Sequence, residues 1–105
     1  MLVAIICLDK PNHLDQRMAT RPSHLEWLIA NMPDGAYVGP LFDDDGETFK
    51  GSLYILEFES VNSARDWIKN EPYYKADLFE SVTMRPSRNI LPMGLAVWAK
   101  VSSDS

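Results

Sequence analysis

The sequence contains one cysteine among its 105 residues, Cys7, which lies in the apolar run formed by residues 2–8. A lone cysteine cannot form an internal disulfide, and this usage fits a reducing, cytoplasmic setting. Apolar neighbours raise the pKa of a thiol rather than lower it, so we expect Cys7 to pack in the core and not to act as a nucleophile.

Basic residues are also scarce in this chain. It has 10 Lys and Arg against 15 Asp and Glu, which gives a net charge of -5 and an isoelectric point near 4.8. Because binding to DNA or RNA requires a basic surface that neutralises phosphates, we expect no nucleic-acid partner and favour a small-molecule ligand. The five glycines are scattered without a phosphate-binding pattern, so neither a nucleotide site nor another bound cofactor is expected.

Metal ligands do not occur in a usable pattern. The two histidines, His13 and His24, are eleven residues apart, and no cysteine pair or His-x-x-x-His spacing accompanies them. The acidic residues 43–45 also fail as a calcium loop, because the glycine after them would place Leu41 at the first ligand position and Ser52 at the twelfth. We therefore expect no metal site and interpret residues 43–47 as a solvated turn.

No hydrophobic stretch is long enough to span a bilayer. The N-terminal apolar run has no basic segment before it and is too short for a signal peptide. Residues 90–101 are apolar but include Pro92, Gly94 and Lys100, whereas a spanning helix needs about 20 apolar residues. No membrane association is expected.

Hydrophobic periodicity predicts four strands and two main helices in one domain over residues 1–105. Residues 2–8 are apolar on both alternating faces, which is typical of a strand buried on two sides. Residues 14–32 follow the period of a helix, which Pro22 either opens or kinks. The remaining predicted segments are strands at 36–42, 52–59 and 79–85, a helix from the N-cap Ser60 to residue 70, and a short turn or helix at 71–74.

This β-α-β-β-α-β order is that of an α+β, ferredoxin-like fold with an antiparallel sheet. Helices cover only one face of such a sheet, and Leu53 and Ile55 add apolar side chains to the other face. We therefore expect a homodimer packed sheet to sheet, or a tail wrapped across the partner. The apolar residues 90–105 form that tail in our prediction, as a fifth strand or as an arm at the dimer interface.

His24 is the strongest candidate for chemistry, because an imidazole titrates near neutral pH and two guanidiniums, of Arg17 and Arg21, share its flank of the predicted helix. His24 lies about 90° from the centre of the apolar stripe of this helix, at the border of the core. The same pattern also fits a boundary histidine bonded to a nearby carbonyl, with both arginines in ordinary surface pairs. Two carboxylates, of Asp34 and Glu71, are candidates to orient the ring, and distance along the sequence does not decide between them. The stripe consists of Leu25, Leu28, Ile29 and Met32.

Several short motifs, taken in order, resemble the YciI-like (YCII-related) family over residues 2 to about 88. No single motif is specific, but their order and spacing are. The matching stretches are Leu8-Asp9-Lys10, Arg17-x-x-x-Arg21-Pro22-x-His24-Leu25-x-x-Leu28, Gly39-Pro40, Gly51, Phe58-Glu59-Ser60, Pro72-Tyr73 and Ala76-Asp77-Leu78-Phe79.

The resemblance implies a ferredoxin-like domain that dimerises into an α/β barrel similar to muconolactone isomerases. It also implies a small-molecule enzyme with a His-Asp site, in which His24 matches the family histidine and Asp34 is the first candidate for the aspartate. The implied activity is that of a cofactor-independent lyase or isomerase acting on a small oxygenated cyclic or aromatic compound. A non-catalytic dimeric module that binds a small ligand is the alternative. The residues expected to contact the substrate are Arg17, Arg21, Glu71 and Tyr73.

Two positions depart from the family pattern. The usual Asp-Pro-Tyr is Glu71-Pro72-Tyr73 in this chain, and the usual Ala-Gly-Leu is Ala76-Asp77-Leu78. Glu71 keeps a carboxylate on a longer side chain, so it stays an alternative partner for His24. Asp77 introduces a carboxylate where the family has no side chain.

Overall fold

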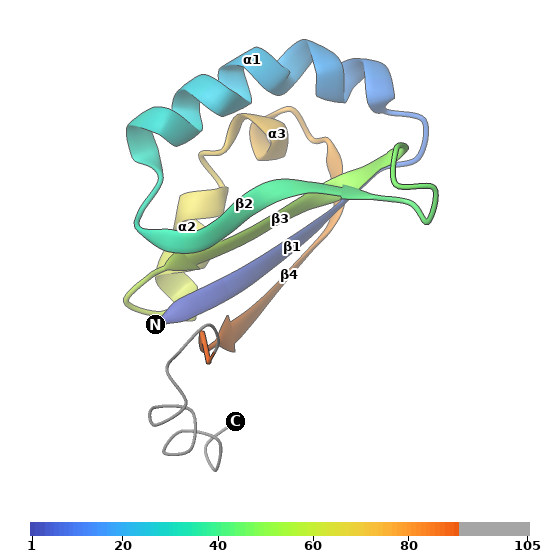
Figure 1. Ribbon diagram of the computed structural model, residues 1–105. Coiled ribbons are helices and arrows are strands. Elements are labelled where there is room, and N and C mark those ends of the chain that lie inside the picture. The colour runs from blue at the N-terminus through green and yellow to red at the C-terminus, as the bar shows by residue number, and fades with distance from the viewer. Residues whose placement is uncertain (91–105) are drawn as a thin grey trace.

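The computed structural model describes residues 1–90 (Figure 1). Four strands form one antiparallel sheet in the order β2-β3-β1-β4. The elements in chain order are β1 (Leu2–Asp9), α1 (Leu14–Asn31), β2 (Gly35–Phe42), β3 (Phe49–Glu57), α2 (Val61–Ile68), α3 (Pro72–Lys75) and β4 (Phe79–Ser87). The predicted ferredoxin-like order is confirmed, with α3 as an added turn of helix before β4. Residues 91–105, which make up nearly all of the predicted tail, lie outside the described residues.

The hydrophobic core lies between the sheet and the helices, which all cover one face of the sheet (Figure 1). Helix α2 packs on this face through Ala64 and Ile68, which were both predicted to point inward. The helix begins after the predicted N-cap Ser60, whose Oγ accepts a hydrogen bond from the backbone N–H of Ser63 at 3.1 Å. The core residues contributed by β1 alternate along the strand and are Val3, Ile5 and Cys7.

Helix α1 turns a different side to the sheet from the one that its apolar residues predict. Its buried residues are Arg17, His24 and Leu28, which share one face of the helix. His24 is only 7% exposed, so the expectation that it borders the core is wrong: it lies on the buried face. Pro22 lies inside this single helix and does not open it. The members of the predicted stripe that remain exposed are Leu25, Ile29 and Met32.

The sheet face directed away from the helices is apolar at its centre. In the pairing of β1 with β3, Ala4 lies opposite Ile55 and Ile6 lies opposite Leu53. These side chains alternate with the core residues, so they point to the other side of the sheet, where they are half-buried. No helix among residues 1–90 covers this face (Figure 1).

Residues 43–47 form a polar turn between β2 and β3. The Asp45 carboxylate accepts hydrogen bonds from the backbone N–H groups of Glu47 and Thr48, both at 2.8 Å, which makes residues 43–47 the solvated turn that was predicted. Within residues 1–90, no group of three or more His, Cys, Asp or Glu side chains is placed to hold a metal ion.

In the same part of the chain, no helix has the length and apolar character needed to cross a bilayer.

Asp77 occupies a left-handed backbone conformation, with φ of 59°, directly after α3. Glycine is favoured there, which explains the Gly of the family pattern. The Asp77 carboxylate is exposed and pairs with Lys10 Nζ at 2.6 Å.

We expect Asp77→Gly to be more stable than Asp77→Ala by about 1 kcal/mol in urea unfolding, because only Ala carries a Cβ into the left-handed region. Both variants lose the ion pair with Lys10, so its small contribution cancels in this comparison. Equal stability of the two variants would contradict a left-handed residue at this position.

Candidate active site

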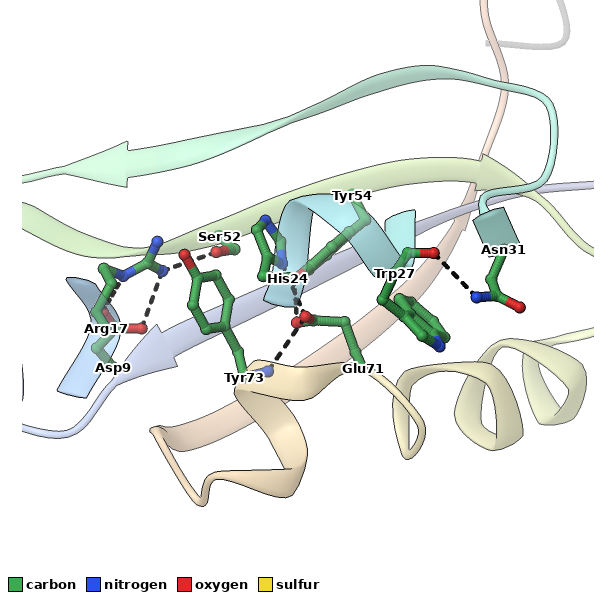
Figure 2. Close-up of polar contacts among 9 residues, drawn as sticks. All are labelled: Asp9, Arg17, His24, Trp27, Asn31, Ser52, Tyr54, Glu71 and Tyr73. Atoms are coloured by element: carbon green, nitrogen blue, oxygen red, sulfur yellow. Dashed lines mark hydrogen bonds and ion pairs between the residues drawn. The ribbon is translucent and has the colours of Figure 1, made fainter. Parts of the chain in front are cut away.

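The centre of the site is a buried contact between α1 and the start of α3. His24 Nδ1 lies 2.7 Å from Glu71 Oε1, although the two residues are 47 positions apart in the sequence. The Glu71 side chain is fully buried, and its two oxygens take three hydrogen bonds in all (Figure 2). The other two donors are the hydroxyl of Tyr54, at 2.7 Å from Oε2, and the backbone N–H of Tyr73, at 3.1 Å from Oε1.

These contacts fix the tautomer of the imidazole. Burial and then the charge of Glu71 raise the pKa of the Tyr54 hydroxyl, so this group stays protonated and donates. The Glu71 carboxylate therefore acts as an acceptor toward every neighbour, and His24 Nδ1–H donates to it. The neutral ring then carries its lone pair on Nε2, the arrangement required of a general base. Figure 2 shows the second ring nitrogen on the side of the imidazole away from Glu71.

Tyr73 forms the middle layer of a three-part stack. Its ring lies parallel to the imidazole of His24, with centroids 4.0 Å apart and planes inclined by 19°. The guanidinium carbon of Arg17 lies 4.6 Å from the Tyr73 ring centroid. Figure 2 shows Arg17 and His24 on either side of the tyrosine. Because Glu71 is the N-cap of α3 and Tyr73 lies in its first turn, one short segment supplies both the carboxylate and the stacking ring.

Arg17 is buried, at 3% exposure, and its guanidinium donates hydrogen bonds to residues of β1 and β3. Its Nε donates to Asp9 Oδ2 at 2.6 Å and its Nη2 donates to Asp9 Oδ1 at 3.2 Å. Nη2 also donates to Ser52 Oγ at 2.7 Å. Burial opposes the charge of Arg17, but the hydrogen bond and charge of Asp9 outweigh it and raise the pKa of the guanidinium. Arg17 is therefore a charged residue that is paired with Asp9 of β1, bonded to Ser52 of β3 and stacked on Tyr73 of α3, while its Nη1 makes no hydrogen bond within residues 1–90.

A cavity of about 350 Å³ lies between α1 and the strands β2 and β3. Its charged and polar lining comes mainly from α1, with Arg17, Arg21 and His24, and Tyr73 adds its ring. The opposite wall, from β2 and β3, is apolar apart from Ser52. The residues of that wall are Val38, Gly39, Pro40, Phe42 and Phe49.

The structure brings together most of the residues that the sequence singled out, but not Asp34. His24, Arg17, Arg21 and Tyr73 line the cavity, and Glu71 lies behind His24. The prediction that Asp34 is the partner of His24 is wrong. Asp34 is exposed beyond the C-terminal end of α1, and the helix from His24 to Asn31 alone spans about 10 Å. The alternative, Glu71, holds the ring instead.

Sequence reasoning missed three residues that hold the site: Asp9, Ser52 and Tyr54. Asp9 belongs to one of the motifs of the family resemblance but was given no role. Ser52 and Tyr54 alternate along β3 on its core face, so their shared direction was visible in the sequence. Their partners, Arg17 and Glu71, lie on other elements and were not.

Cys7 lies in the core, as expected, and is not an activated nucleophile. Burial, followed by the charges of Glu71 and Asp9, raises the pKa of its thiol. The thiol therefore stays protonated near neutral pH.

The chain is similar in sequence to known proteins. The family model of the YCII-related domain matches residues 1–88 of this chain. Protein YciI from Escherichia coli O6:H1 (strain CFT073) is 34% identical over 97 residues, which cover 86% of this chain and 99% of that protein.

Two solved structures share the fold. The 5-chloro-2-hydroxyhydroquinone dehydrochlorinase TftG from Burkholderia phenoliruptrix AC1100, in complex with 2,5-dihydroxybenzoquinone, matches with a TM-score of 0.76 and 27% identity, covering 85% of this chain and 95% of that chain. A proposed antibiotic biosynthesis monooxygenase from Bacteroides thetaiotaomicron VPI-5482 matches with a TM-score of 0.52 and 15% identity, covering 90% of this chain and 92% of that chain, and shows the fold alone.

Proposed function

Because the chain belongs to the YCII-related domain family, we propose that it is a cofactor-independent enzyme of lyase or isomerase type that moves a proton on a small oxygenated ring compound. The observation that carries this proposal is the hydrogen bond from His24 Nδ1 to Glu71 Oε1 beside a cavity large enough for a small molecule. The dehydrochlorinase supports the substrate class, because it matches over 85% of this chain and holds a hydroxyquinone.

In the proposed reaction, His24 Nε2 removes a proton from an O–H or C–H group of the ring compound, and the electrons of that bond enter the ring. A lyase then releases a leaving group with its bonding electrons, so the net change is the loss of an acid. An isomerase instead returns the proton from the imidazolium to another ring atom. Glu71 holds the required tautomer of His24 and stabilises the imidazolium that forms. Tyr73 keeps the imidazole ring in place by stacking on it.

The direct test is a screen of the purified protein for conversion of chlorinated hydroxyhydroquinones, hydroxyquinones and lactones, starting with 5-chloro-2-hydroxyhydroquinone under anaerobic conditions. Absorbance changes report ring chemistry, and ion chromatography reports chloride release. We expect turnover after dialysis against EDTA with no cofactor added. Saturable binding without turnover across the panel would contradict an enzyme and favour the non-catalytic ligand-binding module.

We also propose that the protein forms a homodimer through the sheet face that carries Leu53 and Ile55, because a monomer gains nothing from exposing this apolar surface. Sedimentation at micromolar concentration is expected to give twice the 11.9 kDa of one chain. Ile55→Asp is expected to shift the protein to a monomer, because a carboxylate cannot be buried unpaired in an apolar interface. Ile29→Asp, the same change on the exposed side of α1, is the matched control and should remain dimeric. A wild-type monomer would contradict the proposal.

A further inference from the structure

The charge around the cavity is opposite in sign to the net charge of the whole chain. The net charge of the protein is -5, yet Arg17, Arg21 and His24 line the cavity and, among residues 1–90, no Asp or Glu does. A cavity lined by two arginines and by no carboxylate attracts anions, and low-dielectric walls such as its apolar side strengthen that attraction.

Arg17 and His24 are each already matched by a carboxylate. Asp9 accepts two hydrogen bonds from Arg17, which also contacts the Ser52 hydroxyl and the rings of Tyr73 and Phe49. Glu71 accepts from His24 and offsets the charge that the imidazole gains when it takes a proton. The charge of each group is therefore already offset by a carboxylate, although Arg17 Nη1 makes no hydrogen bond within residues 1–90 and keeps donors for a ligand.

Arg21 is the exception. It lies at the cavity, is exposed, and makes no hydrogen bond or ion pair with any other residue in the range 1–90. Its position three residues before His24 places both side chains on the same side of α1, one helical turn apart. An anionic oxygen bound by Arg21 would therefore hold the adjacent edge of a ring near the imidazole, while the other edge of the ring meets the apolar wall.

We infer that Arg21 supplies the uncompensated positive charge that binds anions at this site, and that it selects flat ring compounds carrying one ionised oxygen on the edge that faces α1. This inference rests on the proposed function for the location of the ligand, but it concerns binding and not turnover. Arg17, whose charge Asp9 offsets, stacks on the Tyr73 ring, which in turn lies against the imidazole of His24.

The test compares two probes of similar shape by isothermal titration calorimetry at neutral pH. The first, 2,5-dihydroxybenzoquinone, is a vinylogous acid and is anionic, whereas 2,5-dimethyl-1,4-benzoquinone is neutral. Wild type is expected to bind the anionic probe about tenfold or more tightly than the neutral probe, since a hydrogen bond to a charged group contributes more than one between neutral groups. Arg21→Gln should remove this preference by weakening only the anionic probe, and Arg21→Lys should keep part of it.

The matched control is Arg65→Gln, which makes the same change in charge at an exposed residue of α2 whose side chain contacts Asn62. This variant should retain the full preference. The inference is overturned if Arg21→Gln still prefers the anionic probe, if wild type binds both probes equally, or if wild type shows no saturable binding of the anionic probe. His24→Asn separates this inference from the proposed function, because it should keep the binding preference even though it is expected to lose turnover.

Discussion

Replacing His24 with asparagine is expected to lower kcat/KM by a factor of about 100 or more on any ring compound that the protein converts. The asparagine amide nitrogen takes the place of Nδ1 and can still donate to Glu71, but nothing replaces the lone pair of Nε2. Steady-state kinetics on wild type and variant measure the loss. Urea unfolding should show a change within about 1 kcal/mol, because the buried carboxylate keeps its donor.

His24→Ala is the companion variant, in which the base and the packing of the ring are lost together. It also removes the base, but it leaves Glu71 with one donor fewer and opens space beside the Tyr73 ring. We therefore expect the same loss of activity together with a loss of stability of about 2 kcal/mol. A folded His24→Asn variant with full turnover would reject the role of the imidazole as a base and leave a residue that serves packing alone.

The overall fold could be predicted because alternation and helical period are local signals. The alternating burial of β1 and the inward residues Ala64 and Ile68 of α2 follow directly from the order of apolar side chains. The N-cap role of Ser60 follows from side-chain chemistry within three residues. Each of these features depends on neighbours in the sequence, so the sequence alone displays it.

The orientation of α1 could not be predicted in the same way, because its buried face is polar. A stripe of apolar residues is normally the buried side of a helix, and this rule placed Ile29 in the core, where the structure leaves it 89% exposed. Arg17 and His24 are buried instead because each meets a carboxylate, of Asp9 and of Glu71. A buried charge is tolerated only with such a partner.

The partner of His24 depends on the same long-range packing. Asp34 is ten residues from His24 and Glu71 is 47 residues away, yet only Glu71 reaches the ring. The reason is the position of α3: it packs against α1, so the residue that caps its first turn faces the imidazole. Nothing in the local sequence of either carboxylate carries this information.

Glu71→Ala is expected to cost about 3 kcal/mol of unfolding free energy in urea denaturation, the largest stability loss of the substitutions considered for this chain. The change leaves the Tyr54 hydroxyl and His24 Nδ1–H buried without an acceptor, and removes the side-chain cap from the Tyr73 backbone N–H. Turnover should fall with it, since the imidazole loses the group that fixes its tautomer.

Glu71→Gln separates the charge of this residue from its shape. The amide oxygen can still accept from His24 and from the Tyr73 backbone, and its NH₂ group can donate to the Tyr54 hydroxyl, so we expect a stability loss of only about 1 kcal/mol. The imidazolium that forms during proton transfer would lose its neighbouring negative charge, and kcat should drop by about tenfold or more while KM stays nearly constant. A Glu71→Gln variant with unchanged kcat would show that the carboxylate only positions the ring. In that case the charge of Glu71 would have no part in proton transfer, and its burial would be explained by the hydrogen bonds alone.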